Sequence, residues 1–183
     1  MAYSIEQDVD QILLSEQQIA QRVAELGAQI TADYADRPLM LVGILKGAGI
    51  FHADLARAIK GRVQLDFMVA SSYGSGAVSS GTLHIIKDLE GDVAGKDILL
   101  VEDIVDTGLT LSELQQYLLG RGAASVKICA LLNKPARRKV DVTIDYLGYT
   151  VPDEFIIGYG IDYAESYRNL PYIASLKREI YER

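Results

Sequence analysis

Residues 98–110 read Ile-Leu-Leu-Val-Glu-Asp-Ile-Val-Asp-Thr-Gly-Leu-Thr, and this stretch decides the fold that we expect. Its apolar run 98–101 follows a Gly-Lys-Asp turn at 95–97, a pattern that predicts a short buried strand. A helix is predicted directly after it, because four leucines share one helical face: Leu111, Leu114, Leu118 and Leu119. Gly120 and Gly122 then supply signals that end the helix. A strand that passes directly into a helix is the repeating unit of an α/β sheet.

The end of this strand carries polar groups that suit a phosphorylated sugar. Glu102 and Asp103 would repel a phosphate, but they can accept hydrogen bonds from sugar hydroxyls or hold a divalent ion through oxygen. The amides of residues 106–110 open the predicted helix, where amide hydrogens and the helix dipole attract anions. Gly108 lets the backbone approach a ligand closely, and the two threonines add hydroxyl donors. The alternative is a solvated turn whose acidic residues merely cap the helix.

The same strand-helix unit recurs along the chain. Ser15 and Gln18 form a capping box, and a helical apolar face follows over residues 19–30. A second helix is predicted through residues 51–59. Further strands are predicted at 39–45, 63–70, 83–89 and 126–132. Because strands alternate with helices, we predict an α/β fold with a parallel central sheet flanked by helices.

Composition excludes several classes of protein. The 183 residues suit a single domain, and the apolar content of 49% is ordinary for a globular chain. No apolar run approaches the ~20 residues that span a bilayer, and the acidic segment 1–10 is not a targeting peptide. The single cysteine, Cys129, lies in an apolar run and is expected to be a buried, inert thiol. We therefore expect a cytoplasmic protein without a membrane partner.

A net charge of −7 argues against broad nucleic-acid binding, which needs a basic surface. One basic cluster is present, at Lys134, Arg137, Arg138 and Lys139. It could contact RNA, but a solvated turn is the favoured interpretation. No nucleic-acid partner is expected.

Ligand-type residues follow three of the predicted strands. Lys46 follows the strand at 39–45, Glu102 follows the strand at 98–101, and Lys134 follows the strand at 126–132. Ligands of open α/β sheets bind beyond the carboxyl ends of the strands. The sequence therefore predicts one binding site that these three strand ends share.

Residues 101–110 resemble the phosphoribosyl diphosphate signature of the type I phosphoribosyltransferases. Three further segments, in the expected order, resemble the hypoxanthine(-guanine) phosphoribosyltransferases of bacteria: Gly43-Ile-Leu-Lys-Gly47, Ser72-Tyr73-Gly74, and Phe155-Ile-Ile-Gly-Tyr-Gly-Ile-Asp162 running on to Arg168. The resemblance implies a core of about residues 16–144, with a small hood formed by about 1–15 and 145–183. It also implies a homodimer or homotetramer.

The activity that this resemblance implies belongs to purine salvage. The 5-phosphoribosyl group of phosphoribosyl diphosphate is transferred to N9 of hypoxanthine or guanine, and IMP or GMP and pyrophosphate are released. Mg²⁺ is the implied cofactor, because it bridges phosphate oxygens. Two alternatives stay open: a regulator that senses phosphoribosyl diphosphate, and an enzyme that prefers xanthine. The order of preference among hypoxanthine, guanine and xanthine is also left open.

The resemblance assigns the sugar and its 5-phosphate to seven residues: Glu102, Asp103, Asp106, Thr107, Gly108, Leu109 and Thr110. Asp106 is the implied catalytic residue, because the matching aspartate faces N7 of the purine and can accept its proton. Its alternative role is to cap the helix. Leu109 departs from the lysine of the animal enzymes, and we expect no loss of activity from that change.

The other implied roles lie outside this segment. Pyrophosphate would be bound by Lys46, Gly47 and Arg168. In the family, the loop that holds the matching lysine and glycine contains an unusual cis peptide. Lys134 would donate to the 6-oxo group and so disfavour adenine. Phe155 would stack on the purine, and the backbone of Ile156 would read the purine edge. Magnesium would be held by Glu102, Asp103 and Asp162. A mobile lid would be formed by Ser72, Tyr73 and Gly74. For Lys46 and Lys134 the alternative is an ordinary solvated lysine.

Overall fold

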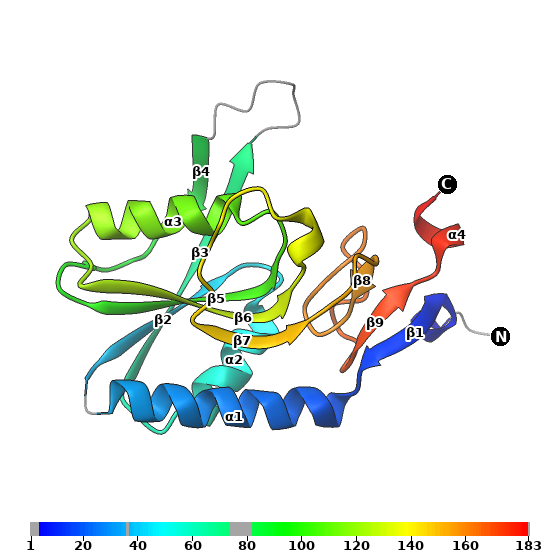
Figure 1. Ribbon diagram of the computed structural model, residues 1–183, viewed down its shortest axis with the longest axis horizontal. Helices are drawn as coiled ribbons and strands as arrows, with labels where there is room; N and C mark the ends of the chain where they lie inside the picture. Colours follow the sequence, from blue (N-terminus) through cyan, green and yellow to red (C-terminus); the bar gives the residue numbers. More distant parts are fainter. Residues whose placement is uncertain (1–3, 36, 74–81, 183) are drawn as a thin grey trace.

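A six-stranded sheet forms the centre of the computed structural model, which describes residues 4–35, 37–73 and 82–182 (Figure 1). The strand order is β4-β3-β2-β5-β6-β7. The strands are β2 (Leu39–Ile44), β3 (Val63–Tyr73), β4 (Thr82–Lys87), β5 (Asp97–Val105), β6 (Ser125–Asn133) and β7 (Tyr146–Thr150). All neighbouring pairs are parallel except β3 and β4, which are antiparallel.

The predicted α/β fold with a parallel central sheet is confirmed, and β4 adds an antiparallel strand at the edge of that sheet. Eight residues, 74–81, separate β3 from β4. A parallel pair needs a crossover of a dozen or more residues, whereas a short connection can join only antiparallel strands. The sheet is therefore mixed and mostly parallel.

Helices cover both faces of this sheet (Figure 1). α1 (Glu16–Tyr34) and α2 (Gly49–Ala58) lie on one face, and α3 (Leu109–Gly120) lies on the other. The predicted capping box opens α1, since the Gln18 amide donates to Ser15 Oγ and the Ser15 amide donates to Gln18 Oε1. The prediction that Leu119 belongs to the buried face of α3 is wrong. Its side chain is 47% exposed, because it lies to the side of that face.

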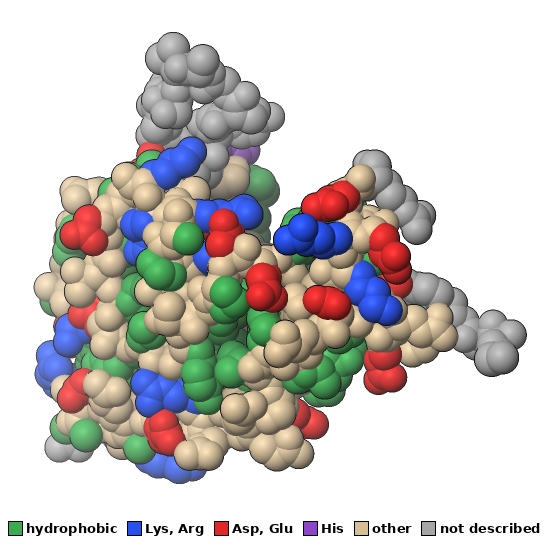
Figure 2. Space-filling model, turned by 45° about the vertical axis from the view of Figure 1, so that its right-hand side comes forward, with side chains coloured by type: hydrophobic (Ala, Val, Ile, Leu, Met, Phe, Trp, Pro, Cys, Tyr) green, Lys and Arg blue, Asp and Glu red, His purple; other side chains and the backbone are tan. Residues whose placement is uncertain are grey.

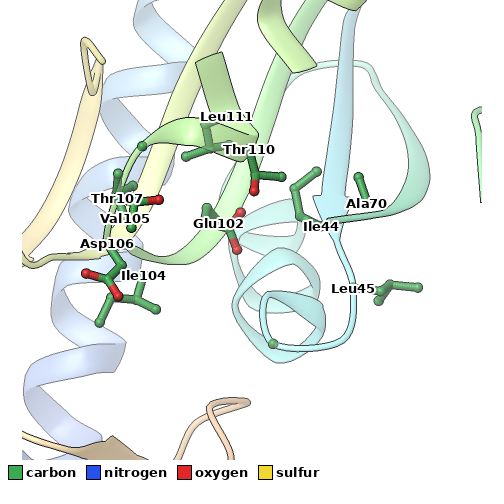
Figure 3. A pocket seen from close by; sticks show the side chains of 12 residues that line it. Ile44, Leu45, Ala70, Glu102, Ile104, Val105, Asp106, Thr107, Thr110 and Leu111 are labelled. Carbon is green, nitrogen blue, oxygen red and sulfur yellow. The ribbon is translucent and has the colours of Figure 1, made fainter. Parts of the chain in front are cut away.

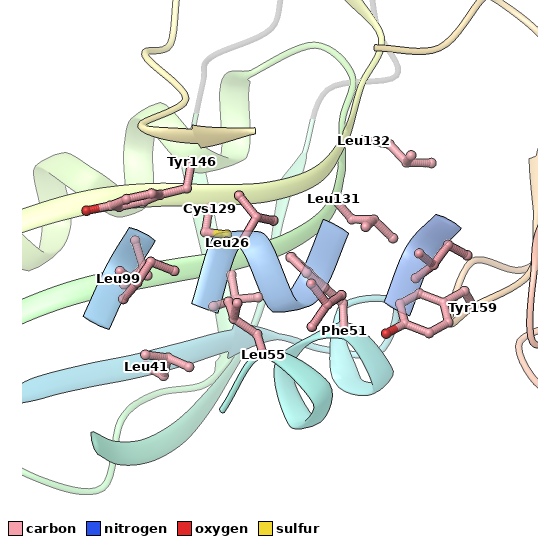
Figure 4. Packing of buried hydrophobic residues seen from close by; sticks show 14 of the residues in the cluster. Leu26, Leu41, Phe51, Leu55, Leu99, Cys129, Leu131, Leu132, Tyr146 and Tyr159 are labelled. Carbon is pink, nitrogen blue, oxygen red and sulfur yellow. The ribbon is translucent and has the colours of Figure 1, made fainter. Parts of the chain in front are cut away.

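The core consists of two layers separated by the sheet. In β2, Leu39 and Leu41 pack toward α1 and α2, whereas Met40 and Val42 pack toward α3. Sheets covered on both faces have such continuous apolar strands. Cys129 lies within the first layer (Figure 4), fully buried, and burial raises the pKa of its thiol. This confirms the expectation of a buried thiol.

A smaller antiparallel sheet forms the hood beside the main body. Its order is β1-β9-β8, from β1 (Val9–Leu14), β9 (Ile173–Leu176) and β8 (Ile156–Ile157). The short helix α4 (Arg178–Tyr181) and the 3-10 turns η1 (Ile5–Asp8) and η2 (Pro135–Arg137) complete the structure. β7 still belongs to the main sheet, so the hood takes its C-terminal part from residues beyond Thr150. Figure 2 shows the hood as a lobe that carries charged side chains of both signs. None of the described helices is long and apolar enough to cross a membrane.

Candidate active site

A cavity of about 250 Å³ lies at the carboxyl ends of β2 and β5, beside the start of α3 (Figure 3). Glu102 and Thr110 project toward this space from β5 and α3, and Ile44 and Leu45 border it on the side of β2. Six of the residues expected to bind the sugar phosphate or pyrophosphate line it: Gly47, Glu102, Asp106, Thr107, Gly108 and Thr110. The structure thus brings together most of the predicted phosphate-binding residues.

The strand that carries the acids is longer than predicted. β5 continues to Val105, because Glu102 pairs with Ala130 and Val105 pairs with Asn133 of β6. Glu102 and Asp103 are therefore strand residues rather than loop residues. Since successive side chains of a strand point to opposite faces, Glu102 reaches the cavity while Asp103 turns toward the loop after β2.

Asp103 supports the loop that holds Lys46. Its carboxylate is 9% exposed, and Oδ1 accepts a hydrogen bond from the Ile104 amide at 2.7 Å. A Cβ on Gly47 would lie 1.7 Å from Asp103 Oδ2, so only glycine lets the loop rest on this carboxylate. The Leu45–Lys46 peptide in the same loop is cis, as the resemblance implied.

The paired carboxyls of Glu102 and Asp103 are chemically suited to a divalent cation. Burial, and next the negative charge of Asp103, raise the pKa of Glu102 well above its ordinary value. Burial raises the pKa of Asp103 as well. A nearby cation would favour the ionised form of both groups, and Mg²⁺ prefers such oxygen ligands.

These two carboxyls would hold Mg²⁺ only together with ligands from outside the protein. Among the described residues, no three His, Cys, Asp or Glu side chains gather closely enough to hold a metal alone. Asp162 does not join Glu102 and Asp103, because its carboxylate binds Arg168 and the Glu165 amide. Mg²⁺ commonly keeps waters and phosphate oxygens as ligands, so a pair of carboxyls fits an ion shared with a diphosphate.

The loop between β5 and α3 is shaped by backbone contacts. Gly108 precedes α3 with φ of 82°, and a Cβ there would lie 2.6 Å from the Val140 carbonyl oxygen. The amides of Lys139 and Val140 donate to the Thr107 carbonyl at 2.9 and 3.1 Å. Arg138 donates to the Asp106 carbonyl at 3.2 Å. The segment 138–140 therefore fixes the loop from outside and leaves its inner side to the cavity.

Asp106 does not cap the helix. The Leu109 amide at the start of α3 donates to Thr107 Oγ1 at 3.4 Å, and Asp106 Oδ1 is buried without a hydrogen-bond partner among the described atoms. A buried carboxylate oxygen without a partner is costly, and such groups concentrate at functional sites. The alternative role of helix capping, which we considered from the sequence, is therefore wrong.

Lys134 is a buried residue rather than a solvated one. It follows β6, is 6% exposed, and its Nζ donates to the Glu154 carbonyl at 2.7 Å. Burial, and next the charge of Arg137, lower the pKa of its ammonium group, while the negative charge of Asp106 acts in the opposite direction. The interpretation of the basic cluster as a solvated turn is thus wrong for Lys134. Lysines are rarely buried this deeply unless they are paired, and the partners here are the Glu154 carbonyl and the Asp153 carboxylate, 3.9 Å away.

The residues implied for the purine lie at the start of β8. The ring of Phe155 is stacked on Tyr181 with centroids 4.7 Å apart, and the Tyr163 ring meets it edge-on at 5.2 Å. Ile156 is 4% exposed and pairs through its backbone with Ser175 of β9. Lys134 lies close to both residues, because it binds the carbonyl of the adjacent Glu154. No role was predicted for Tyr181, because the residues next to it in the sequence form no recognisable motif.

The residues implied for pyrophosphate lie where the hood meets the main body. Lys46 Nζ pairs with Glu165 Oε2 at 2.7 Å, and Arg168 Nη2 pairs with Asp162 Oδ1 at 2.8 Å. Gly160, with φ of 102°, packs so closely that a Cβ would lie 2.0 Å from the Gly47 carbonyl oxygen. The sequence reasoning missed Glu165 and Gly160, because both act across more than a hundred residues of chain.

The predicted lid is only partly described. Ser72 and Tyr73 belong to β3, where they pair with Leu83 and Thr82 of β4. They are therefore strand residues, and the prediction of a loop at these two positions is wrong. Antiparallel pairing explains the difference, since it extends β3 beyond its apolar part. Gly74 lies outside the described residues.

Comparison with known proteins gives concordant matches. Residues 9–164 match the family model of the phosphoribosyl transferase domain. A hypoxanthine-guanine phosphoribosyltransferase of Bacillus subtilis is 51% identical over 175 residues, which are 96% of this chain and 97% of that protein. The structure also resembles the crystal structure of a hypoxanthine phosphoribosyltransferase from Staphylococcus aureus, with a TM-score of 0.95, 46% identity and full coverage of both chains. A hypoxanthine-guanine phosphoribosyltransferase of Bacillus anthracis matches with a TM-score of 0.88 and 46% identity, over 92% of this chain and 99% of that one.

Proposed function

The chain belongs to the phosphoribosyl transferase domain family, and we propose that it is a purine-salvage enzyme that uses hypoxanthine and guanine. It transfers the 5-phosphoribosyl group of phosphoribosyl diphosphate to N9 of the base and releases pyrophosphate. The observation that carries the proposal is the buried Lys134, whose amide donates to the carbonyl of Val105, the residue before Asp106, together with the Asp106 Oδ1 that has no partner among the described atoms. Relatives that are about half identical over nearly the whole chain carry this activity in their names.

Base selection depends on Lys134 in this proposal. Its ammonium is held at the Glu154 carbonyl with further donors to spare, and it faces the 6-oxo group of the purine. Adenine would present an amino group to this cation and leave a buried donor unpaired, which costs factors of ~10⁴ or more in selectivity. Phe155 supplies the stacking surface, and the backbone of Ile156 reads the other edge of the base.

Asp106 manages the proton of the base. A carboxylate at N7 accepts a proton as N9 attacks C1 of the ribose, and its buried oxygen is available for that bond.

The sugar diphosphate is held from three sides. The amides and hydroxyls of residues 107–110 bind the 5-phosphate at the start of α3. Lys46, Gly47 and Arg168 bind pyrophosphate, and Glu102, which reaches the cavity, binds the ribose hydroxyls. Glu102 and Asp103 would hold Mg²⁺ together with phosphate oxygens, and the ion would supply positive charge that stabilises the leaving pyrophosphate, whereas Asp162 stays paired with Arg168.

Turnover with a panel of bases tests the proposal. Hypoxanthine and guanine with phosphoribosyl diphosphate and Mg²⁺ should yield IMP and GMP with stoichiometric pyrophosphate, whereas adenine should give neither product. Removal of Mg²⁺ with a chelator should abolish turnover, and added Mg²⁺ should restore it. Absence of turnover together with tight binding of nucleic acid would support a regulator instead. Dominant turnover of xanthine would support an enzyme that prefers xanthine.

The proposal also includes a cytoplasmic location and assembly as a homodimer or homotetramer.

A further inference from the structure

Glu165 lies between the two cations of the proposed pyrophosphate site. Its Oε2 is 2.7 Å from Lys46 Nζ, and its Oε1 is 3.6 Å from Arg168 Nη2. Both carboxylate oxygens therefore face a cation from a different part of the chain. A diphosphate held by the same two side chains would have to take the place of this carboxylate.

The backbone brings Glu165 to this position. Tyr163 and Ser166 exchange hydrogen bonds across a tight turn, in which Ala164 and Glu165 have positive φ of 48° and 61°. The Glu165 amide donates to Asp162 Oδ2 at 2.9 Å. The close contact of Gly160 with Gly47 fixes the same turn against the Lys46 loop. The ion pair is thus part of the contact between hood and main body.

We propose that Glu165 acts as an internal counter-anion that competes with the diphosphate group for Lys46 and Arg168, and so weakens binding of the anionic substrate. This inference rests on the proposed function of those two cations. Glu165 is a determinant of affinity for the diphosphate and has no part in binding the base.

The exposure of the pair sets the size of the effect. The side chains of Lys46 and Glu165 are 66% and 67% exposed, so water and salt weaken their attraction. Exposed ion pairs are weak, so the loss of this pair should change the affinity by no more than about fivefold. Arg168 keeps its stronger contact with Asp162, and its Nε is buried without a partner among the described atoms.

Glu165→Gln tests the proposal, because it removes the charge and keeps the size of the side chain. We expect the Kd of inorganic pyrophosphate with Mg²⁺, measured by calorimetry, to fall about two- to fivefold. The KM of phosphoribosyl diphosphate should fall in parallel, while the KM of hypoxanthine stays unchanged. The gain should shrink as salt is added, because screening already weakens the pair in the unmodified protein.

Glu90→Gln is the matched control. Glu90 is an 85% exposed glutamate that lies 3.8 Å from Lys87, outside the cavity. The Glu90→Gln substitution should leave the Kd of pyrophosphate unchanged. An unchanged or higher Kd in Glu165→Gln, or an equal gain in Glu90→Gln, would overturn the proposal.

Lys46→Met separates this inference from the proposed function. Weaker pyrophosphate binding in Lys46→Met, without any effect of Glu165→Gln, would overturn the role of Glu165 alone. If Lys46→Met binds pyrophosphate as the unmodified protein does, Lys46 is not part of the diphosphate site and the proposed role of Glu165 loses its basis, whereas turnover of hypoxanthine and guanine by the unmodified protein still decides the proposed function.

Discussion

The Tyr181 ring stacks on the Phe155 ring, with their centroids 4.7 Å apart and their planes inclined by 22°. Tyr181 belongs to α4, at the C-terminal end of the chain, whereas Phe155 directly precedes β8. The Lys177 amide anchors this end, since it donates to the Asp8 carbonyl at 3.0 Å. One side of the proposed base platform is therefore supported by the two ends of the chain.

Tyr181→Ala should weaken binding of the base. Loss of an aromatic pair removes about 0.5–1.5 kcal/mol of stabilisation, so the KM of hypoxanthine should rise about two- to tenfold. The KM of phosphoribosyl diphosphate should stay within about twofold, because Tyr181 does not line the phosphate cavity. Tyr181→Phe keeps the ring and should behave as the unmodified enzyme. Steady-state kinetics with each substrate varied in turn measure both effects, and equal changes in the two KM values would contradict the assignment.

Asp106→Asn should lower kcat far more than it weakens binding. General acid–base catalysis contributes about 10²–10⁴-fold, so we expect a loss of about a hundredfold or more. The Kd of pyrophosphate with Mg²⁺ should change little, since the Asp106 side chain makes no helix cap that could disturb the loop.

The unfolding temperature supplies the control for Asp106→Asn. Because Asp106 Oδ1 has no hydrogen-bond partner among the described atoms, the variant should be as stable as the unmodified protein or more stable. A clear loss of stability with near-normal kcat would assign a structural role to Asp106.

Gly160→Ala should separate the hood from the Lys46 loop. A Cβ at this position meets the Gly47 carbonyl at 2.0 Å, and φ of 102° strains any other residue. We expect a loss of about 1–3 kcal/mol in the free energy of unfolding, together with a higher KM for phosphoribosyl diphosphate. Chemical denaturation and kinetics measure the two effects.

Gly91→Ala is the control for this substitution. Gly91 has open space where a Cβ would be placed, and its φ is not positive. The free energy of unfolding of Gly91→Ala should stay within about 0.5 kcal/mol of that of the unmodified protein. Equal losses in the two variants would show that the Gly160 contact has no special importance.

Local patterns in the sequence predicted which residues of the β5–α3 segment gather around the cavity. Residues 98–110 combine an apolar run, acids and a glycine turn within one strand and one helix start, so neighbours in sequence are also neighbours in space. Lys134 could be placed at the same edge of the sheet, because parallel strands end together. Its burial could not be predicted, since this depends on Glu154 and its neighbours, twenty residues away.

Contacts over long distances in the chain could not be read from the sequence. The turn that carries Glu165 meets Lys46 across 119 positions, and Tyr181 reaches Phe155 because β9 pairs with β8 and α4 directly follows β9. The antiparallel direction of β4 could not be read from the sequence for a similar reason. Apolar patterning marks a strand but does not give its direction, which is set by its partner and connection.

A second cluster, at Asp88, links the start of the β4–β5 connection to α3. Tyr117 and Arg121 both donate to the Asp88 carboxylate, and the Leu89 amide donates to it at 2.7 Å. Burial raises the pKa of Asp88, but these hydrogen bonds and the positive charge of Arg121 outweigh it. The pKa is therefore lower than its ordinary value.

The lowered pKa of Asp88 predicts how stability depends on pH. A carboxyl whose pKa is lower in the folded state stabilises the fold above its unfolded pKa of about 3.9, and this contribution is lost as the pH falls through the folded pKa. Asp88→Asn should therefore be less stable than the unmodified protein at pH 6–8, and the difference should narrow below about pH 4. Urea denaturation of both proteins from pH 3 to pH 8 measures this difference. A difference that stays constant over this range would show that ionised Asp88 contributes nothing through Tyr117 and Arg121.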